Sequence, residues 1–352
     1  MNYTKFLISI PYMITWELVS FFRREIQIDF LAGNIVDYIC FKNVHELIPE
    51  IRIVARNKKV QKILKNYGVE SVVYPTFPSL IIMARHLTRK FPSKKLKKIG
   101  MRHGAYHFKD FINRHEYNAF EKFFVTSSKE VTIAESKGIK STIAVGFPKI
   151  DSFFNKTLDI EKNKKELFSK LSLDNNKKTI LFTATWNKNG YSAIESWFNK
   201  LDIISSEYNI LVTTHHLVSK DKIEVIKRTK DITYLDDKDI MKYYTVSDLM
   251  IGDISSIIAE FCAIDKPIIT FRVKETKRFT NEIQSMLEEI SYRIDTFAEL
   301  ERIIPIALSN PEFHSEKRKH YNNIMFDELD GMASVRAKDE ILETVKELKD
   351  KV

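Results

Sequence analysis

Hydroxyl and carboxyl side chains stand where a predicted strand passes into a predicted helix, in the stretch IGDISSIIAEFCAIDKPIITF at residues 251–271. Asp253, Ser255 and Ser256 follow the strand end and precede the apolar run Ile257 to Ala263. Ser and Asp commonly cap helices by accepting hydrogen bonds from the first N–H groups. The same N–H groups, with serine hydroxyls added, can instead bind a phosphate. Capping is the commoner use, so phosphate binding needs support from other parts of the sequence.

Two histidines also follow predicted strands, one in each half of the chain. His103 comes after the strand Lys98 to Arg102 and precedes Gly104 in a tight loop, and His215 comes after the strand Asn209 to Thr214. Imidazole titrates near neutral pH, which suits it to general base catalysis. A single loop histidine is usually a surface or capping residue, but two at strand ends could face one cleft. Both are therefore candidate catalytic residues.

Motifs of several other chemistries are absent from the sequence. His103, His107 and His115 are spaced by four and eight residues, but across a glycine and without a cysteine or HExxH context, so a metal site is a poor explanation. There is no P-loop, GxGxxG or GxSxG motif. The remaining candidates, including Thr185 after the strand Thr179 to Phe182, suit binding a diphosphate and moving a proton. We expect neither a metal nor a cofactor.

Strand and helix patterns alternate through most of the chain, which is typical of βαβ units and parallel sheets. The predicted strands are Gln27 to Ala32, Ile51 to Val54, Ser71 to Tyr74, Lys98 to Arg102, Lys122 to Thr126, Thr142 to Val145, Thr179 to Phe182, Asn209 to Thr214, Ile232 to Leu235, Leu249 to Ile251 and Pro267 to Phe271. The predicted helices are Lys58 to Tyr67, Ser79 to Arg89, Ser192 to Ser205, Lys220 to Arg228, Lys238 to Tyr244, Ile257 to Ala263, Thr296 to Leu308 and Ser334 to Lys351. Ligands of such sheets bind beyond the carboxyl ends of the strands, where the candidate residues stand.

A Lys- and Asn-rich segment, Leu158 to Lys178, separates two similar halves. The sequence therefore predicts an α/β protein with two doubly wound, Rossmann-like domains facing each other across a cleft. The predicted domains are residues 1–157 and 158–330, and a helix over 331–352 could pack back on the first of them. A chain of 352 residues suits two domains, because single cores stop growing near 250 to 300 residues.

Composition bounds the partners only loosely. The 56 Lys and Arg against 47 Asp and Glu give a net charge of +9, which suits a polyanion or an anionic membrane surface. Much of the excess lies in lysine runs such as Lys94 to Lys98, which are most often solvated faces. No motif that reads DNA or RNA accompanies them. Cys40 and Cys262, both in apolar surroundings, indicate a reducing cytoplasm rather than a disulfide scaffold.

The segment Thr4 to Phe22 is strongly apolar over about the length of a membrane-spanning helix. It contains Pro11 and Glu17 and has no small-residue cleavage site, so it fits neither a signal peptide nor a clean span. Three interpretations stay open: a buried first helix, a membrane-surface helix with aromatic and basic anchors, and a true span.

Five stretches, in this order, resemble the CDP-glycerol glycerophosphotransferases that build teichoic acids and related capsule polymers. They are RHG at 102–104, FVTSS at 124–128 with GFPKID at 146–151, ILFTATW at 180–186, NILVTTHH at 209–216, and the stretch at 251–271. The chain departs from the usual pattern beside the expected nucleotide and glycerol, which leaves the donor open. The departures are Arg102 for Trp, His216 for Pro, Ile254 for Tyr, and Asn187-Lys188 where an Arg often follows the Trp.

The resemblance implies the GT-B architecture, with an acceptor-side first domain and a nucleotide-donor second domain. His103 would be the general base for the acceptor hydroxyl, and His215 a further donor to the diphosphate. Glu260 falls where the family has an Asp and shares a helix face with Ser256, so it could reach the ribose or be paired within the structure. Asp253 could orient a hydroxyl or cap the helix, and Ser255 and Ser256 would cap the helix when the site is empty. The expected donor-binding residues are Ser255, Ser256, Asp253, Thr185, Glu260 and Gly104.

The function predicted in this way is transfer of a glycerol-phosphate-like group from a CDP-linked donor to a hydroxyl of a cell-surface polymer or lipid-linked acceptor. The enzyme would be peripheral at the inner face of the cell membrane and would not bind nucleic acid. One alternative is a GT-B glycosyltransferase that uses a nucleotide sugar for capsule or lipopolysaccharide synthesis. Another, from a different class, is a non-catalytic protein that binds polyanions.

Overall fold

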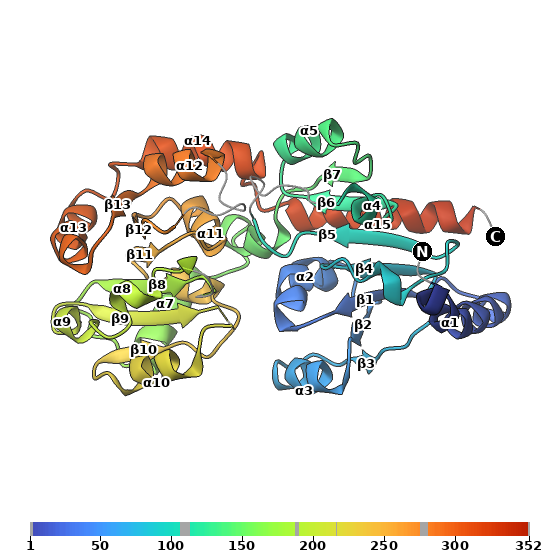
Figure 1. Cartoon of the computed structure of the whole chain (residues 1–352), viewed down its shortest axis with the longest axis horizontal. Helices are drawn as coiled ribbons and strands as arrows, with labels where there is room; N and C mark the ends of the chain where they lie inside the picture. Colours follow the sequence, from blue (N-terminus) through green and yellow to red (C-terminus); the bar gives the residue numbers. More distant parts are fainter. Residues whose placement is uncertain (1–2, 106–112, 187–189, 216, 275–280, 351–352) are drawn as a thin grey trace. The chain divides into compact units, whose positions relative to one another are not determined.

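The computed structural model describes residues 3–105, 113–186, 190–215, 217–274 and 281–350. The chain divides into two compact units (Figure 1). Unit 1 comprises Met1–His103, Phe111–Ser152 and Asp330–Val352, and unit 2 comprises Gly104–Asp110 and Phe153–Leu329. Each unit is built on its own parallel sheet.

The sheet of unit 1 has seven strands in the order β3-β2-β1-β4-β5-β6-β7, all parallel. The strand order reverses between β1 and β4, so this is a doubly wound sheet with its switch point there. Phe30, Leu31, Val54, Ile81 and Ile82 are fully or almost fully buried within it, as expected where helices cover both faces. The strands are β1 (Ile28–Ala32), β2 (Arg52–Ala55), β3 (Val72–Val73), β4 (Leu80–Met83), β5 (Lys97–Met101), β6 (Lys122–Val125) and β7 (Thr142–Ala144).

The sheet of unit 2 has six strands in the order β10-β9-β8-β11-β12-β13, again all parallel. Its switch point lies between β8 and β11, and its core includes Phe182, Trp197 and Phe271. The strands are β8 (Thr179–Ala184), β9 (Asn209–Thr214), β10 (Ile232–Tyr234), β11 (Leu249–Gly252), β12 (Ile268–Phe271) and β13 (Tyr292–Ile294).

Helices connect the strands in both units. In unit 1 they are α1 (Tyr3–Phe22), α2 (Ile35–Leu47), α3 (Lys58–Asn66), η1 (Thr88–Lys90), α4 (Arg114–Tyr117), α5 (Ser128–Ser136), η2 (Pro148–Ile150) and α15 (Ala333–Lys349), and α6 (Asp151–Phe154) runs from unit 1 into unit 2. In unit 2 they are α7 (Ile160–Lys170), α8 (Ile194–Trp197), α9 (Asp202–Ser205), α10 (Lys220–Arg228), η4 (Met241–Tyr244), α11 (Ile257–Ala263), α12 (Asn281–Ile290), α13 (Phe297–Ser309) and α14 (Ser315–Phe326).

Three of the helix predictions are wrong in part or in full. The helix predicted over Ser79 to Arg89 is instead the buried strand β4 followed by a loop and η1. A short apolar run such as LIIM fits a buried strand as well as a helix, so the pattern could not separate them. The helix predicted over Ser192 to Ser205 is two single-turn helices, and that over Lys238 to Tyr244 is a 3₁₀ turn. The prediction also omitted α2, α5, α12, α14 and β13.

The last helix, α15, belongs to unit 1. Asp151 accepts hydrogen bonds from the N–H groups of Ala333 (3.2 Å) and Ser334 (2.6 Å), which are the first residues of this helix. Carboxylates are favourable at this position because the first N–H groups of a helix lack partners. Lys122, on β6, pairs with Glu340 (2.5 Å) and with Glu343. These contacts join the C-terminal helix to the start of α6 and to β6.

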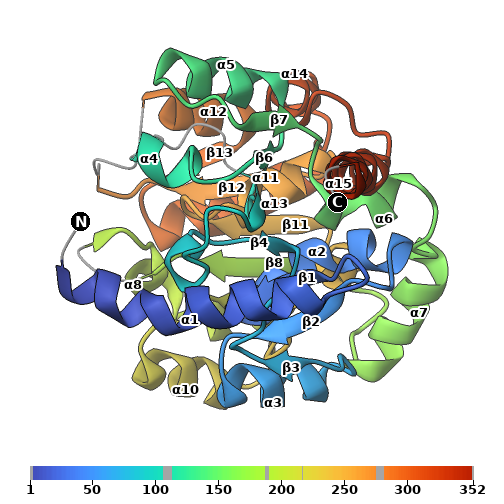
Figure 2. The same ribbon diagram turned by 90° about the vertical axis from the view of Figure 1, so that its right-hand side faces the viewer.

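The first helix, α1, is buried on one side only. Tyr12 Oη donates to Thr76 O (2.8 Å) and Trp16 Nε1 donates to Pro78 O (2.8 Å), and both side chains join a core cluster of unit 1. The helix lies at the edge of the sheet where the strands begin (Figure 2). Ile14, Leu18, Phe21 and Phe22 on its other face are exposed, so the predicted buried first helix is buried along one face only. Over the described ranges of the chain, no helix has both the length and the apolar character needed to cross a membrane.

Candidate active site

Three neighbouring strands of unit 2 carry the predicted donor residues at their carboxyl ends. Strand β8 lies between β9 and β11, with Ala184 paired to Thr214 and Phe182 paired to Ile251. Thr185 follows β8, His215 follows β9, and the Asp253 to Ser256 segment follows β11. The switch point of the sheet falls between β8 and β11, where doubly wound sheets bind ligands. The fold thus brings Thr185, His215, Ser255 and Ser256 to one edge of one sheet.

Asp253 is the hub that joins two of these strand ends. Its side chain is fully buried, and its carboxylate accepts hydrogen bonds from the N–H groups of Thr185 (3.1 Å), Ala193 (3.1 Å) and Ile254 (2.7 Å). Burial raises the pKa of Asp253, while these backbone donors and the Ser192 hydroxyl oppose the rise. Because the carboxylate is inaccessible, the prediction that Asp253 binds the donor directly does not fit. It fixes both ends of the segment from Thr185 to Ala193.

Ser255 and Ser256 lie at the start of α11 but do not cap it with their side chains. Ser256 occupies the N-cap position with a helical backbone (φ −61°, ψ −16°), and its side chain makes no capping hydrogen bond. Ile258 N–H donates to the backbone oxygen of Ser255 (3.0 Å) instead. The prediction that these serines cap the helix is therefore wrong. Within the described residues, no hydrogen bond is assigned to either hydroxyl, and both side chains are partly exposed.

Gly252 allows α11 to lie close to the end of β8. A Cβ added at this glycine would come within 2.8 Å of both Ile258 Cδ1 and Thr183 Cγ2. Neither atom could move away without disturbing the core, because both residues are buried. Gly104, which belongs to unit 2, is similar: an added Cβ would lie 3.3 Å from Ser256 Oγ. Gly252 thus permits the close packing of α11 on β8, and Gly104 lies beside the Ser256 side chain.

Glu260 is buried within unit 2. Its side chain is 2% exposed and accepts a hydrogen bond from Tyr244 Oη at 3.0 Å. Burial and the neighbouring Glu260 carboxylate raise the pKa of Tyr244 well above its ordinary value. Of the two roles predicted for Glu260, the structure shows pairing within the protein, and a direct contact with a ribose does not fit its burial.

His215 is held as a hydrogen-bond donor. Its Nδ1 accepts the N–H of Leu217 at 3.2 Å, and its backbone N–H donates to Ala184 O at 3.0 Å. Since Nδ1 must offer a lone pair to that N–H, the neutral ring carries its proton on Nε2. The side chain is partly exposed. His215 can therefore donate Nε2–H to an anion at this edge of the sheet.

His103, in unit 1, is held in the opposite way. Its Nδ1 lies 3.0 Å from Ala84 O, just beyond the end of β4. A carbonyl can only accept, so Nδ1 carries a proton and, in the neutral ring, Nε2 keeps a lone pair. The side chain is exposed at the carboxyl end of β5. A general base that acts through Nε2 requires this tautomer. A hydrogen bond from Nδ1–H to a backbone carbonyl commonly fixes it.

Comparison with known proteins identifies the family. Residues 90–343 match the family described as CDP-Glycerol:Poly(glycerophosphate) glycerophosphotransferase. The chain belongs to this family. The matched region contains His103, His215 and the two serines, so it includes the candidate residues of both units. The family predicted from the sequence is thus confirmed.

Curated relatives of the chain include teichoic acid enzymes. The chain is 23% identical to the Staphylococcus aureus teichoic acid ribitol-phosphate polymerase TarK, over 89% of this chain and 58% of that protein. It is 28% identical to the Bacillus spizizenii teichoic acid glycerol-phosphate primase, over 59% of this chain and 55% of that protein. It is 29% identical to the Bacillus spizizenii teichoic acid poly(glycerol phosphate) polymerase, over 38% and 35% respectively. The chain spans about half the length, or less, of the curated relatives it matches.

Comparison with solved structures establishes the fold of the chain. A variant of the wall teichoic acid polymerase TagF is similar with a TM-score of 0.72 at 15% identity, covering 99% of this chain and 98% of that one. A UDP-GlcNAc 2-epimerase from Neisseria meningitidis is similar with a TM-score of 0.62 at 13% identity, covering 90% and 100%. The predicted fold class, α/β with two doubly wound units of the GT-B type, is confirmed.

Sequence reasoning missed the groups that hold the candidate residues in place. The backbone oxygen of Ala84 orients His103, but a carbonyl has no sequence signal and the β4 strand was predicted as helix. Arg102 pairs with the buried Glu130 at 2.6 Å beside His103, and Glu130 also accepts the Thr126 N–H at 2.9 Å. The spacing of Ser127 and Glu130 is that of a capping box, which could have indicated this carboxylate. His107 and His216 lie outside the described residues.

Replacing Asp253 with Asn should destabilise unit 2. The Asn side chain has one acceptor oxygen, and its NH₂ group would face N–H donors that the carboxylate now satisfies, so buried donors lose their partner. We expect the free energy of unfolding to fall by about 2–3 kcal/mol, measured by urea denaturation. The matched control is Asp231→Asn, on an exposed residue with a positive φ (60°) that Asn tolerates. Equal stability of the two variants would contradict the hub role.

Proposed function

We propose that the protein transfers a glycerol-phosphate-like group from a CDP-linked donor to a hydroxyl of a growing polymer or lipid-linked acceptor. The single observation that carries the proposal is that its two histidines are held as opposite tautomers. His103 keeps a lone pair on Nε2, and His215 carries a proton there. Alcohol attack on a diphosphate needs one base and one anion donor, and these tautomers supply them. Family membership supports the choice of substrates.

Unit 2 would bind the donor. The hydroxyls of Ser255 and Ser256 and the Nε2–H of His215 would donate hydrogen bonds to the diphosphate oxygens. Helix α11 has only seven residues, so we assign these contacts to side chains rather than to the helix dipole. Phosphoryl transfer depends mainly on positioning and charge neutralisation, which such donors can supply. Asp253 would keep the β8 and β11 ends in register for this contact.

Unit 1 would supply the base. The acceptor oxygen forms a bond to the distal phosphorus of the donor while its proton passes to His103 Nε2. The bond between that phosphorus and the bridging oxygen breaks, and CMP leaves with the bridging oxygen. The products are CMP and an acceptor longer by one glycerol-phosphate-like unit. The Nδ1–H group keeps its hydrogen bond to the Ala84 carbonyl, and this hydrogen bond stabilises the imidazolium that forms.

A donor panel tests the proposal directly. The protein is incubated with CDP-glycerol, CDP-ribitol, UDP-sugars and GDP-sugars, each with a primed glycerol-phosphate acceptor, and nucleotide release is measured. We expect CMP from a CDP-alcohol and no UDP or GDP. Release of UDP or GDP would indicate the glycosyltransferase alternative. Absence of any release, with ligand binding intact, would indicate the non-catalytic polyanion-binding protein.

We also propose that the enzyme works as a peripheral protein at the inner face of the cell membrane, where a lipid-linked acceptor would be held. The net charge of +9 supports this, because anionic lipid surfaces attract basic proteins. Nucleic acid is not a proposed partner.

A further inference from the structure

Three cations lie along the carboxyl edge of the unit 1 sheet, the same edge that carries His103. Arg85 comes two residues after the end of β4, Arg56 comes directly after β2, and Lys90 is the last residue of η1. Arg56 N–H donates to Ala32 O (3.0 Å) at the end of β1, which places Arg56 at this edge. We call Arg85, Arg56 and Lys90 the basic row.

Arg85 is the member of the basic row beside the candidate base. It follows Ala84, whose backbone oxygen accepts the hydrogen bond from His103 Nδ1–H (3.0 Å). Its Nε donates to both carboxylate oxygens of Asp37 on α2, at 2.8 Å and 3.0 Å. Among the described residues, no hydrogen bond is assigned to Nη1 or Nη2 of Arg85, whose side chain is 33% exposed. The contact with Asp37 therefore fixes the guanidinium and leaves its two NH₂ groups for an oxyanion.

The carboxylate of the Arg85 ion pair is hidden behind the guanidinium. Asp37 is fully buried, and its Oδ2 also accepts the N–H of Gly33 (2.9 Å). A Cβ added at Gly33 would come within 2.8 Å of Asp37 Oδ2 and 3.3 Å of Arg85 Cδ, so the glycine permits this close arrangement. A ligand that approaches the edge from solvent therefore meets the guanidinium and not the carboxylate.

The other two cations of the basic row lie close enough to repel each other. Tyr74, which directly follows β3, donates from Oη to Lys90 O (2.8 Å), and Lys90 Nζ lies 4.2 Å from the centroid of the Tyr74 ring. Partial burial and the nearby positive charge of Arg56 lower the pKa of Lys90. Arg56 is exposed, and within the parts of the chain that the structure describes no ion pair is assigned to either cation. A bound anion would relieve the repulsion between them.

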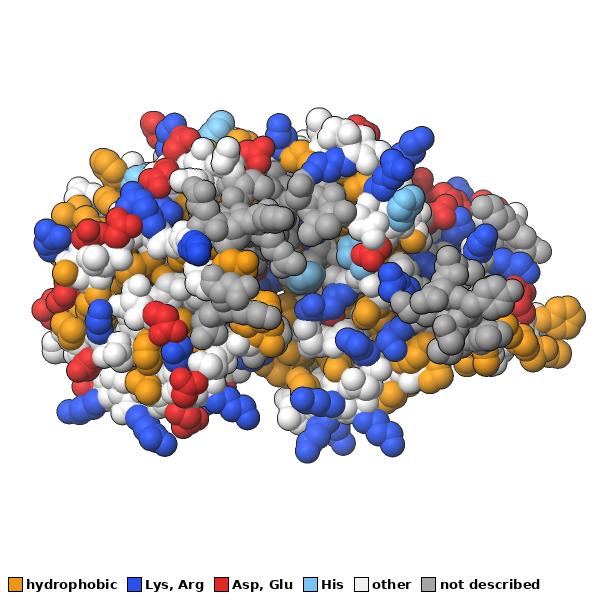
Figure 3. Space-filling view, viewed as in Figure 1, with side chains coloured by type: hydrophobic (Ala, Val, Ile, Leu, Met, Phe, Trp, Pro, Cys, Tyr) orange, Lys and Arg blue, Asp and Glu red, His pale blue; other side chains and the backbone are white. Residues whose placement is uncertain are grey.

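Positive charge continues from the basic row onto α3, which begins two residues after Arg56. Lys58, Lys59, Lys62 and Lys65 on this helix are exposed, and Figure 3 shows Lys and Arg side chains gathered over it. Cations spread along an edge in this way fit a ligand that carries several negative charges along its length better than they fit a single phosphate.

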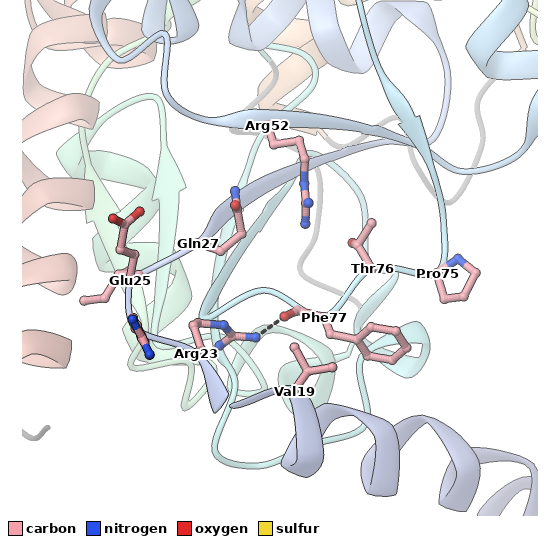
Figure 4. A pocket seen from close by; sticks show the side chains of 10 residues that line it. Val19, Arg23, Glu25, Gln27, Arg52, Pro75, Thr76 and Phe77 are labelled. Atoms are coloured by element: carbon pink, nitrogen blue, oxygen red, sulfur yellow. Dashed lines mark hydrogen bonds between the residues drawn. The ribbon is translucent and has the colours of Figure 1, made fainter. Parts of the chain in front are cut away.

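The opposite edge of the same sheet offers a comparison for Arg85. A pocket of about 590 Å³ lies there, where the strands begin, and Arg52 is one of its lining residues (Figure 4). Arg52 donates to the fully buried Asp29 through Nε (2.9 Å) and Nη2 (3.0 Å), and its side chain is 38% exposed. It stands at the start of β2, four residues or roughly 13 Å from Arg56 at the other end. Arg52 therefore has the same kind of ion pair as Arg85 but does not share an edge with His103.

We propose that the basic row binds phosphodiester groups of the acceptor, with the NH₂ groups of Arg85 on the phosphate next to the attacking hydroxyl. A guanidinium matches the geometry of two phosphate oxygens. The phosphate held in this way places the hydroxyl of the terminal unit near His103 Nε2, and Arg56 and Lys90 bind phosphates farther along the chain. The preferred acceptor is then an anionic polyol-phosphate chain and not a neutral sugar. The inference rests on the proposed function, because it names the acceptor class of the same reaction.

Two acceptors of similar length test the acceptor class. A glycerol trimer linked by phosphodiesters is compared with triglycerol, in which ether links replace the phosphodiesters, and CMP release from a CDP-alcohol is measured with the full chain. We expect kcat/KM to be about tenfold or more higher for the phosphodiester trimer, since hydrogen bonds to charged groups are the stronger ones. The preference should fall as NaCl is raised.

Variants of the two ion pairs test the role of Arg85. Arg85→Gln with Asp37→Asn removes one pair without leaving a buried charge unpaired. We expect its KM for the phosphodiester trimer to rise about tenfold or more, and its KM for triglycerol to stay unchanged. Arg56→Gln, at an exposed position, should raise the KM for the trimer about threefold. The matched control is Arg52→Gln with Asp29→Asn, which should keep both KM values of the unmodified chain.

Three results would overturn the role of the basic row. The first is an equal kcat/KM of the unmodified chain for the two acceptors. The second is an unchanged trimer KM in the Arg85 and Asp37 double variant, or in Arg56→Gln where the double variant does not fold. The third is an equal fall in turnover with both acceptors, which would assign Arg85 to the support of the His103 loop.

Calorimetric titration with the phosphodiester trimer separates this inference from the proposed function. If the unmodified chain releases no CMP from any donor but binds the trimer, and the Arg85 and Asp37 double variant binds it about tenfold more weakly, the proposed function alone is refuted. Absence of both CMP release and trimer binding would overturn both proposals.

Discussion

Replacing His103 with Asn is expected to lower kcat for CMP release by about 10²- to 10⁴-fold, the usual contribution of a positioned general base. The Asn amide N–H can still donate to Ala84 O, as Nδ1–H does now at 3.0 Å. Asn has no basic atom at the position of Nε2, so only the proton transfer is lost. Steady-state kinetics with a CDP-alcohol and a primed acceptor should therefore show a fall in kcat with a smaller change in donor KM.

The matched control is His320→Asn, at an exposed position on α14. We expect this variant to keep full turnover, and both variants to keep the thermal unfolding midpoint of the unmodified chain. Full turnover in His103→Asn would remove His103 from the role of base. A large fall in the unfolding midpoint would instead assign the histidine to the packing of the β4 and β5 ends.

Much of the architecture could be predicted because parallel strands buried on both faces leave a continuous apolar signal. Strand β11 with α11 is an example, since an apolar run, polar residues and a helical run follow one another in the sequence. The prediction of strand β4 failed because a continuous apolar run, which identified other strands, also fits a buried helix. Its four apolar residues carry no period, and the polar residues after it from Arg85 imitate a helix. Only its pairing with β1 and β5 identifies it.

The candidate site could be predicted by position but not by role. Residues after strand ends were found because the carboxyl edge of a doubly wound sheet is a general binding place. Whether a carboxylate there faces a ligand depends on tertiary packing, which no local pattern encodes. Asp253 and Glu260 were both expected to meet the donor, yet both are buried against other groups of unit 2. The tautomers of His103 and His215 are set by contacts with backbone atoms, so the sequence could not predict them either.

Replacing Ser255 and Ser256 together with Ala should lower kcat/KM for the donor by about 10²-fold or more, since hydrogen bonds to a charged group contribute about 1.5–3 kcal/mol each. The effect on stability should be small. Neither side chain caps α11 in the structure, so the usual cost of removing a serine cap, about 0.5–2 kcal/mol, does not apply. The combination of a large kinetic loss and an unchanged unfolding free energy separates ligand binding from capping.

Kinetics and urea denaturation on the same double variant measure kcat/KM and the unfolding free energy. The control is Ser309→Ala, because that exposed serine bonds only to its own chain neighbours at the end of α13: it donates to Ile306 O (3.1 Å) and accepts from the Asn310 amide (3.1 Å) among the described residues. An unfolding free energy lower by about 1 kcal/mol with donor KM unchanged would show that the serines do cap α11 in solution. The donor diphosphate would then need other partners, and His215 alone offers one hydrogen bond from its side chain. The close packing of α11 on β8 that Gly252 permits would then contribute to the core of unit 2 and not to the binding of a ligand.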